Sequence, residues 1–294
     1  MAGAIDKLIE HGRPHAAIHC LYRMHQNKQP IDANQCVRAL LAALSTDESS
    51  SNMDTYHITT LIKYLQTKSD VDQDDLFSVE WAYIPLLDGH RGTVPQLLEN
   101  RMATDPEFFC EVIRLIFRSE KEDSSASEPT EQSKAIARNA WRLLDKWETP
   151  PGSQQNGSFS ADNFTKWLEK VKEYATESGH LEIALSKIGE VLIAAPSDSD
   201  GLWINRAIAS ALNDRDAESM REGYRRGTYN SRGAHWVDPS GKPERELAHQ
   251  FRTKAEQVEN AGYQRFAVTL RVLADGYDRE AERIISDQKN REDH

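Results

Sequence analysis

The sequence predicts an all-α protein in which antiparallel helix pairs stack as an irregular α-solenoid. Three observations lead to this fold class. Apolar residues recur at the i, i+3, i+4, i+7 spacing of a buried helix face from one end of the chain to the other. Short turn signals separate these stripes, and no stretch shows the alternation of a β-strand. Only 38% of the 294 residues are hydrophobic and 28% are charged, which is typical of repeat arrays whose units pack only against their neighbours.

The first half of the chain carries seven apolar stripes. They run over residues 4–9, 17–22, 36–44, 56–65, 76–84, 94–102 and 108–116. Gly12, Pro14 and Pro30 separate the first three, because neither residue type continues a helix well. Pro85 ends or kinks the fifth. Asp105 and Pro106 have the residue types of an N-cap and a first helical position, so they predict the start of the seventh helix.

Two polar segments divide the chain. Ser119–Glu131 is acidic and rich in serine, and Thr149–Ser160 holds paired prolines and two glycines. We expect both to be solvated loops that flank one helix around Ile136–Trp147. The predicted organisation is an N-terminal helical-repeat half at 1–118, these polar loops and their helix at 119–160, and a C-terminal helical half at 161–294.

The second half continues the helical pattern. Stripes cover 164–174, 181–192, 202–212 and 217–224, and two longer helices cover 244–260 and about 264–286. Ser160 is a candidate N-cap, and Gly179 a candidate helix end. The spacing of Gly179, Leu181, Ala184, Leu185, Pro196 and Trp203 resembles a degenerate tetratricopeptide unit. We therefore expect a solenoid of the tetratricopeptide or HEAT kind, although the full repeat pattern is absent.

Composition excludes some classes of partner and indicates a cellular location. The formal net charge of −11 argues against a chain-wide surface for nucleic acid or anionic membrane, while leaving room for a local basic patch. No run of apolar residues is long enough to span a bilayer, and the N-terminus lacks the pattern of a signal peptide. Cys20, Cys36 and Cys110 are odd in number and widely spaced, so we expect a reducing, cytoplasmic location. The helical pattern begins almost at Met1, which suggests a piece excised from a longer protein.

Catalytic and metal-binding motifs are not found in the sequence. It contains no nucleophile elbow, zinc-protease helix, phosphate-binding loop or dinucleotide-binding glycine pattern. His15 and His19 have the spacing of a metal-binding pair, but Gly12 and Pro14 separate them from His11 and no carboxylate lies near in sequence. We expect helix-interface histidines, inert cysteines, no metal, no cofactor and no enzymatic activity.

One segment, Met220–Trp236, has an unusual composition. It contains Gly223, Gly227 and Gly233, and we interpret residues 220–236 as a glycine-punctuated loop. Its candidate binding residues are Arg221, Tyr224, Arg225, Arg226, Tyr229, Arg232, His235 and Trp236. Arginine with tyrosine and tryptophan is typical of protein-binding hot spots and of nucleic-acid surfaces. The alternative is structural, with the aromatic residues pinning the loop and Arg232 paired to Glu244 or Glu246. Aromatic loop residues have this structural role more often.

A resemblance covers most of the chain. It rests on TYNSRGAHW (Thr228–Trp236), ERELA (Glu244–Ala248), LRVLADGYDREAE (Leu270–Glu282), GRPHAAIHCL (Gly12–Leu21) and DTYHI (Asp54–Ile58). These stretches resemble the C-terminal all-helical region of large, mostly uncharacterised bacterial proteins associated with defence against phage. The resemblance implies a sensor or scaffold portion with no catalytic residues of its own.

The predicted function is a non-catalytic protein-interaction, sensor or scaffold module of a larger bacterial protein. Its partner is expected to be another protein or other domains of the same full-length protein, with no membrane involved. One alternative is a nucleic-acid-binding helical domain that uses residues 221–236. The other is an enzyme with an unrecognised site.

Overall fold

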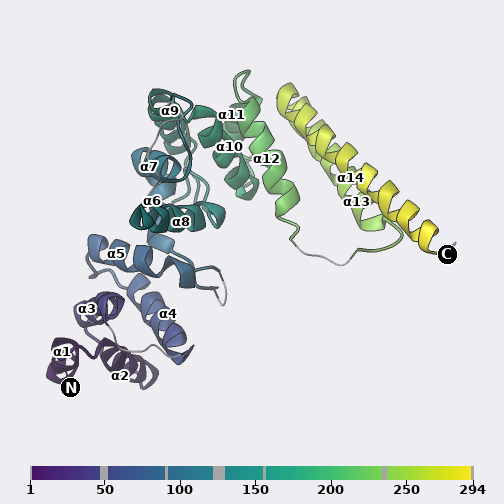
Figure 1. The fold of residues 1–294 in the computed structure, drawn as a ribbon. Helices are drawn as coiled ribbons and strands as arrows, with labels where there is room; N and C mark the ends of the chain where they lie inside the picture. The colour runs from purple at the N-terminus through teal and green to yellow at the C-terminus, as the bar shows by residue number, and fades with distance from the viewer. Residues whose placement is uncertain are drawn as a thin grey trace. The chain divides into compact units, whose positions relative to one another are not determined.

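The computed structural model of the chain describes residues 2–46, 52–89, 92–121, 130–154, 157–233 and 237–292. Within these ranges the protein is all-helical, with fourteen α-helices and short 3-10 helices and no β-strand (Figure 1). The predicted helical class is therefore confirmed. No described helix combines the length and the apolar character that crossing a bilayer requires.

The chain forms two compact units, of which the first comprises Met1–Met102 and Ser127–Trp147. Its helices are α1 (Ala2–Glu10), α2 (Pro14–Gln26), α3 (Ala33–Ala42), α4 (Asn52–Gln66), α5 (Gln73–Tyr83), most of α6 (Gln96–Thr104) and α8 (Glu131–Asp145). The 3-10 turns η1 (Ala43–Ser45) and η2 (Ile84–Leu86) extend α3 and α5. The predicted apolar stripes of α2 to α5 meet in one core that includes Leu21, Leu40, Leu61, Ile62 and Val79.

Carboxylates begin several helices of the first unit. Asp32 and Asp72 are N-caps, and each accepts hydrogen bonds from two backbone N–H groups of α3 or α5. The N-terminus of α6 is capped from another helix: Glu80 on α5 accepts from the N–H of Leu97 at 3.2 Å and of Leu98 at 3.0 Å. Because Glu80 is fully buried, desolvation raises its pKa, although these hydrogen bonds lower it in part.

The second unit comprises Ala103–Ala126 and Glu148–His294. It contains α7 (Pro106–Ile116), α9 (Ala161–Ser178), α10 (Leu181–Val191), η4 (Leu192–Ala194), α11 (Arg206–Asn213), α12 (Glu218–Asn230), α13 (Lys242–Asn260) and α14 (Gln264–Glu292). Local signals fix several boundaries as predicted. Asp105 and Ser160 cap α7 and α9, and Gly179 ends α9 in the left-handed conformation at φ 71°.

The ranges of the two units differ from the division expected at residues 119–160. Helix α8 packs within the first unit, whereas α7 packs on α9 in the second. Residues 119–121, at the start of the first polar segment, are also not a free loop, because they bond to the end of α9. Ser119 donates to the carbonyl of Ser178, and the Lys121 ammonium donates to the carbonyls of Thr176 and Glu177. These contacts satisfy the C-terminal carbonyls of α9, where a cation is favoured.

The expected loop at 220–236 is mostly a helix, so this prediction was wrong. Helix α12 runs to Asn230, and residues 234–236 lie outside the described part of the chain. Two of the three glycines that suggested a loop, Gly223 and Gly227, lie inside the helix, whereas Gly233 follows it with a positive φ of 56°. A Cβ atom at Gly223 would lie 1.8 Å from the Ser186 carbonyl oxygen of α10, and one at Gly227 would lie 2.8 Å from that of Glu190. These glycines are required by close helix packing and not by a turn.

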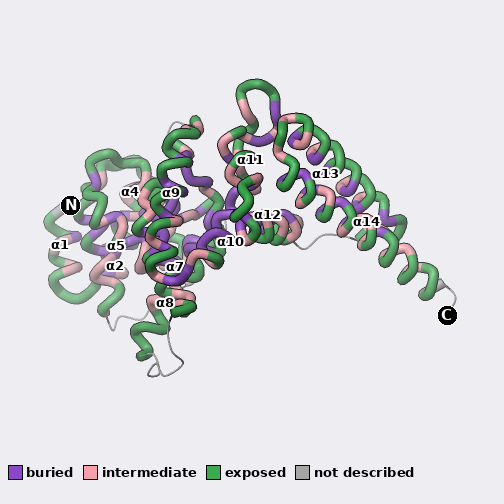
Figure 2. Tube along the Cα trace, turned by 90° about the horizontal axis from the view of Figure 1, so that it is seen from above, coloured by how far each residue is buried: buried purple, intermediate pink, exposed green. Residues whose placement is uncertain are grey.

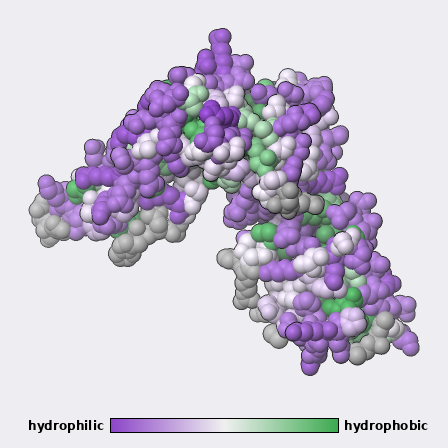
Figure 3. Space-filling view, turned by 180° about the vertical axis from the view of Figure 1, so that it is seen from behind, coloured by the Kyte–Doolittle hydropathy of each residue, from purple (hydrophilic) through white to green (hydrophobic). Residues whose placement is uncertain are grey.

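The pattern of buried residues reflects the packing of helices in pairs. Buried and exposed residues alternate along the helices, as expected when one stripe of each helix packs on a neighbour (Figure 2). The face seen in Figure 3 is mainly hydrophilic, with small hydrophobic areas between the charged side chains. A few large apolar side chains remain exposed, among them Trp141 on α8 and two valines of α14.

Candidate interaction groove between α12 and α14

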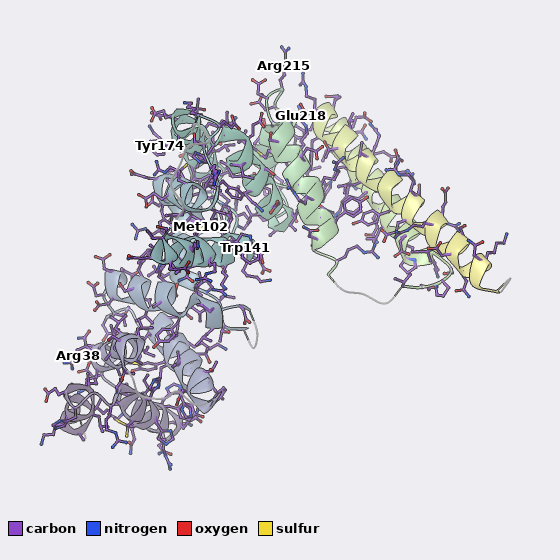
Figure 4. The ribbon with its side chains drawn as sticks, in the orientation of Figure 1. Arg38, Met102, Trp141, Tyr174, Arg215 and Glu218 are labelled. Atoms are coloured by element: carbon purple, nitrogen blue, oxygen red, sulfur yellow. The ribbon has the colours of Figure 1, made fainter. Side chains whose placement is uncertain are left out.

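A groove in the second unit lies between one face of α12 and one face of α14. One cavity of about 310 Å³ is lined by Glu218, Arg221, Glu222, Arg225, Arg265, Val268, Thr269 and Val272. A second, of about 550 Å³, is lined by Glu222, Arg225, Arg226, Tyr229, Val272 and Arg279. The two share three residues and therefore form one continuous groove. Glu218 marks its end near the turn between α11 and α12 (Figure 4).

The α12 wall follows from helical spacing. Glu218, Arg221, Glu222, Arg225 and Tyr229 recur at intervals of three and four residues, which places them on one face of the helix. The opposite face is buried against α10 and consists of Met220, Gly223, Tyr224, Gly227 and Thr228. The close packing on α10 thus decides which side of α12 faces the groove.

The α14 wall combines cations with aliphatic side chains. Its buried stripe includes Phe266, Leu270, Leu273 and Tyr277, and packs mainly on α13. Val268 and Val272 lie outside this stripe, four residues apart, and are 56% and 39% exposed. Arg265 and Arg279 are exposed at either side of the valines, and neither side chain has a hydrogen bond or an ion pair among the described residues.

Three contacts position α14 beside α12. The Asn213 side-chain oxygen at the end of α11 accepts from the backbone N–H of Arg265 at 2.8 Å and caps the start of α14. The Phe266 ring packs edge-on against Tyr224 at 5.2 Å between centroids. A Cβ atom at Gly276 would lie 1.7 Å from the Tyr229 hydroxyl oxygen, so Tyr229 packs directly on the α14 backbone.

Three of the predicted binding arginines have internal partners that differ in kind. Arg221 donates to the carbonyls of Leu212 at 2.9 Å and Asp214 at 2.6 Å, and so caps the C-terminal end of α11. Burial lowers the pKa of Arg221, the charge of Glu218 opposes this in part, and the charge of Arg265 adds a smaller lowering effect. Arg225 and Arg226 form ion pairs in which all side chains are partly exposed.

Those two ion pairs lie along α12. Arg225 pairs with Glu222 of its own helix at 2.6 Å. Arg226 pairs with Glu190 of α10 at 3.1 Å and donates to the Ser186 hydroxyl. Arg226 therefore also ties α12 to α10, whereas the Arg225–Glu222 pair crosses no helix interface. Pairs with this exposure contribute only about 0–1 kcal/mol each, so a ligand can exchange them at low cost.

Arg232 is a structural residue. It forms ion pairs with Glu244 at 2.8 Å and Glu280 at 3.3 Å, and its guanidinium lies 5.4 Å from the centre of the Tyr277 ring. Glu244 is only 1% exposed, so its carboxylate is buried in this ion pair. The alternative interpretation from the sequence, an internal pair of Arg232 with Glu244, is confirmed.

The two tyrosines of the predicted site that the structure describes are not displayed for stacking. Tyr224 is buried, which raises the pKa of its hydroxyl well above the usual value. Burial and the nearby charge of Glu280 also raise the pKa of Tyr229. Its ring packs on Tyr277 at 4.9 Å. His235 and Trp236 lie outside the described residues.

Sequence reasoning missed the α14 wall. Arg265, Val268, Val272 and Arg279 are far from residues 220–236 in the sequence and join them only in the folded chain. One signal was present. Val268 and Val272 add two apolar residues to a helix whose buried stripe is already complete without them.

Histidines gather in the first unit between α2 and α4. The His57 ring stacks on Tyr22 at 4.1 Å and lies 5.1 Å from the His19 ring, while His15 Nδ1 is 3.7 Å from an Asp54 oxygen. Among the residues that the structure describes, no group of three or more histidine, cysteine or carboxylate side chains could hold a metal ion. These histidines are interface residues of two packed helices.

The two buried thiols are unreactive by burial. Desolvation raises the pKa of Cys36 to about 12 and that of Cys110 to about 11, so neither carries a thiolate near neutral pH.

Comparison with known proteins adds no family: no family model matches the chain, nor does any curated protein or solved structure.

Proposed function

We propose that this chain is a non-catalytic protein-interaction module whose helix pairs form an irregular solenoid of the tetratricopeptide or HEAT kind. Its assignment to the C-terminal region of a larger bacterial, defence-type protein is part of the proposal and rests on the sequence resemblance. In that setting the module serves as a sensor or scaffold, and its partner is another protein or another domain of the full-length protein.

One observation carries the binding role: the α12–α14 groove displays two exposed valines between arginines. Val268 and Val272 are 56% and 39% exposed, and Arg265 and Arg279 have no ion pair among the described residues. An aliphatic strip bordered by arginine is typical of a protein-binding surface, because arginine is enriched and lysine depleted in such interfaces.

Several features favour a protein partner over nucleic acid. Tyr224 is buried and Tyr229 packs on α14, so neither offers a free face to a base. Glu218 and Glu222 lie among the arginines of the groove, so it offers no unbroken run of cations to a chain of phosphates. Arg221 caps α11 and Arg232 neutralises Glu244, so the arginine cluster is smaller than its sequence suggests.

Affinity capture followed by reconstitution tests this function. The chain is immobilised and incubated with nuclease-treated lysate of its source organism, and retained proteins are purified and titrated back by calorimetry. We expect a stoichiometric complex with a defined protein. A chain that forms no protein complex but binds single-stranded DNA, with an affinity that falls steeply with salt, would overturn the proposal in favour of nucleic-acid binding.

A further inference from the structure

The groove has the length of a short peptide segment. Its α12 wall extends from Glu218 to Tyr229, which at 1.5 Å per residue is about 16 Å. Its α14 wall extends from Arg265 to Arg279, about 21 Å by the same rise. Either wall matches about three to four helical turns of a bound segment, or about five to six residues of an extended one.

The groove is positively charged in an acidic protein. Five arginines and two glutamates line it, whereas the whole chain carries a formal charge of −11. Because arginines outnumber glutamates five to two along the groove, carboxylates are the complementary groups.

The cations that are free to bind flank the apolar strip. Arg265 lies three residues before Val268, and Arg279 lies seven residues, or about two turns, after Val272. Arg225 faces them from α12, and its ion-pair partner among the described residues is the exposed carboxylate of Glu222. A ligand that fits must therefore present aliphatic side chains at its centre and acidic ones at its ends.

We infer that the α12–α14 groove is the docking site for an acidic peptide segment of a protein partner, with aliphatic side chains on Val268 and Val272 and carboxylates on Arg225, Arg265 and Arg279. The inference rests on the proposed function and deepens it by naming the partner's chemistry. A purely apolar segment would desolvate the arginines without compensation, and a polyanion without aliphatic groups would leave the valines uncovered.

Fluorescence anisotropy with the full chain tests the inference. The probe is a labelled peptide of about fourteen residues with two leucines four positions apart among glutamates, which as a helix spans about 21 Å and so reaches along either wall. The control peptides replace the leucines with serine, or the glutamates with lysine. We expect the first peptide to bind and each replacement to weaken binding by about tenfold or more, since both halves of the surface contribute.

Two double variants test the location. Arg265→Ala with Arg279→Ala, and Val268→Ser with Val272→Ser, change exposed side chains and should leave the circular dichroism spectrum and melting temperature unchanged. Each should weaken peptide binding by about tenfold or more. The matched controls are Arg215→Ala and Val237→Ser, exposed residues of the same types outside the groove, with Arg215 pointing away from the helices (Figure 4). Both controls should bind as the wild-type chain does.

The outcomes separate the inference from the proposed function. Peptide binding that is indifferent to both groove variants overturns the inference, as does equal affinity for the lysine peptide. A single-stranded DNA of matched charge that binds more tightly than the acidic peptide, with the same arginine dependence, also overturns it. If a reconstituted protein partner binds the groove variants unchanged, the interaction module stands and only its docking site is wrong.

Discussion

Two helix pairs in the second unit are held together in different ways. Helices α10 and α12 pack backbone against backbone, because Gly189 on one and Gly223 and Gly227 on the other leave no side chain between them. A Cβ atom at Gly189 would lie only 1.9 Å from the Met220 carbonyl oxygen. Glycine costs about 1 kcal/mol per residue inside a helix, so the close contact offsets a local penalty.

Helices α13 and α14 pack through interlocked side chains. Phe251 and Tyr277 stack at 5.6 Å between ring centres, and buried alanines and leucines fill the remainder of the interface. Ion pairs lie along the rim, including Arg252 with Asp275 and Asp278, and Arg271 with Glu259. The adjacent turn is short, since α13 ends at Asn260 and α14 begins at Gln264.

The contrast between the two pairs shows that tolerance to substitution depends on whether backbone or side-chain atoms form the contact. A backbone-to-backbone contact has no rotamer to adjust, whereas side chains can repack at a modest cost. The α10–α12 contact also explains which face of α12 lines the groove. The glycine face fixes the rotation of α12 about its axis, so the arginine face of that helix must point toward α14.

The largest effect is expected for Gly223→Ala. The new Cβ atom would lie 1.8 Å from the Ser186 carbonyl oxygen, so the two helices must separate and lose their contact. We expect a loss of about 4 kcal/mol or more in the free energy of unfolding, measured by urea denaturation. Gly3→Ala is the matched control, since Gly3 lies within α1 with no atom near its Cβ position. It should be neutral or stabilise by up to about 1 kcal/mol, and equal losses for both would refute the packing argument.

The next largest effect is expected for Arg232→Met, which removes the guanidinium that pairs with the buried carboxylate of Glu244. We expect a loss of about 3 kcal/mol in unfolding free energy, because removing one partner of a buried ion pair is strongly destabilising. Arg252→Met removes an arginine of the same unit that pairs with more exposed carboxylates. It should cost about 1 kcal/mol or less. Similar losses for the two variants would count against the structural role of Arg232.

A smaller effect is expected for Leu273→Met in the side-chain-packed pair. Leu273 is fully buried, but methionine has nearly the same volume and a flexible side chain. We expect a cost below about 1.5 kcal/mol by denaturation. A loss as large as that of Gly223→Ala would show that α13 and α14 are as intolerant as α10 and α12, and would remove the contrast between the pairs.

The smallest effect is a pH dependence in the first unit. Burial, with a further contribution from the charge of His19, lowers the pKa of His57, and Asp54 opposes this in part. The folded chain therefore binds this proton less readily than the unfolded chain does. Stability should fall as the pH drops below the unfolded value of 6.5, a loss that becomes complete below the folded pKa.

Denaturation of variants between pH 7.5 and 5 measures this contribution at about half-unit steps. His57→Gln should flatten the dependence, because glutamine does not titrate. His249→Gln, at an exposed position of α13, is the control and should leave it unchanged. A wild-type chain that is equally stable across this range, or a dependence that survives in His57→Gln, would contradict the assignment to His57.

The helical class and many helix boundaries follow from the sequence alone. Apolar spacing and local residues such as Asp105, Ser160 and Gly179 act within a few positions of the chain, so they can be read without the fold. The Arg232–Glu244 pair was also within reach, because opposite charges twelve residues apart were among the alternatives.

The role of the glycines and the residues that line the groove follow only from the packing of the folded chain. Gly223 has the same local signature in a loop as in a helix that touches another backbone, and only the position of α10 distinguishes them. The groove needs α12 beside α14, whose facing residues lie about forty positions apart. Local pattern carries no information about such a contact, because it depends on packing between helices that are distant in sequence.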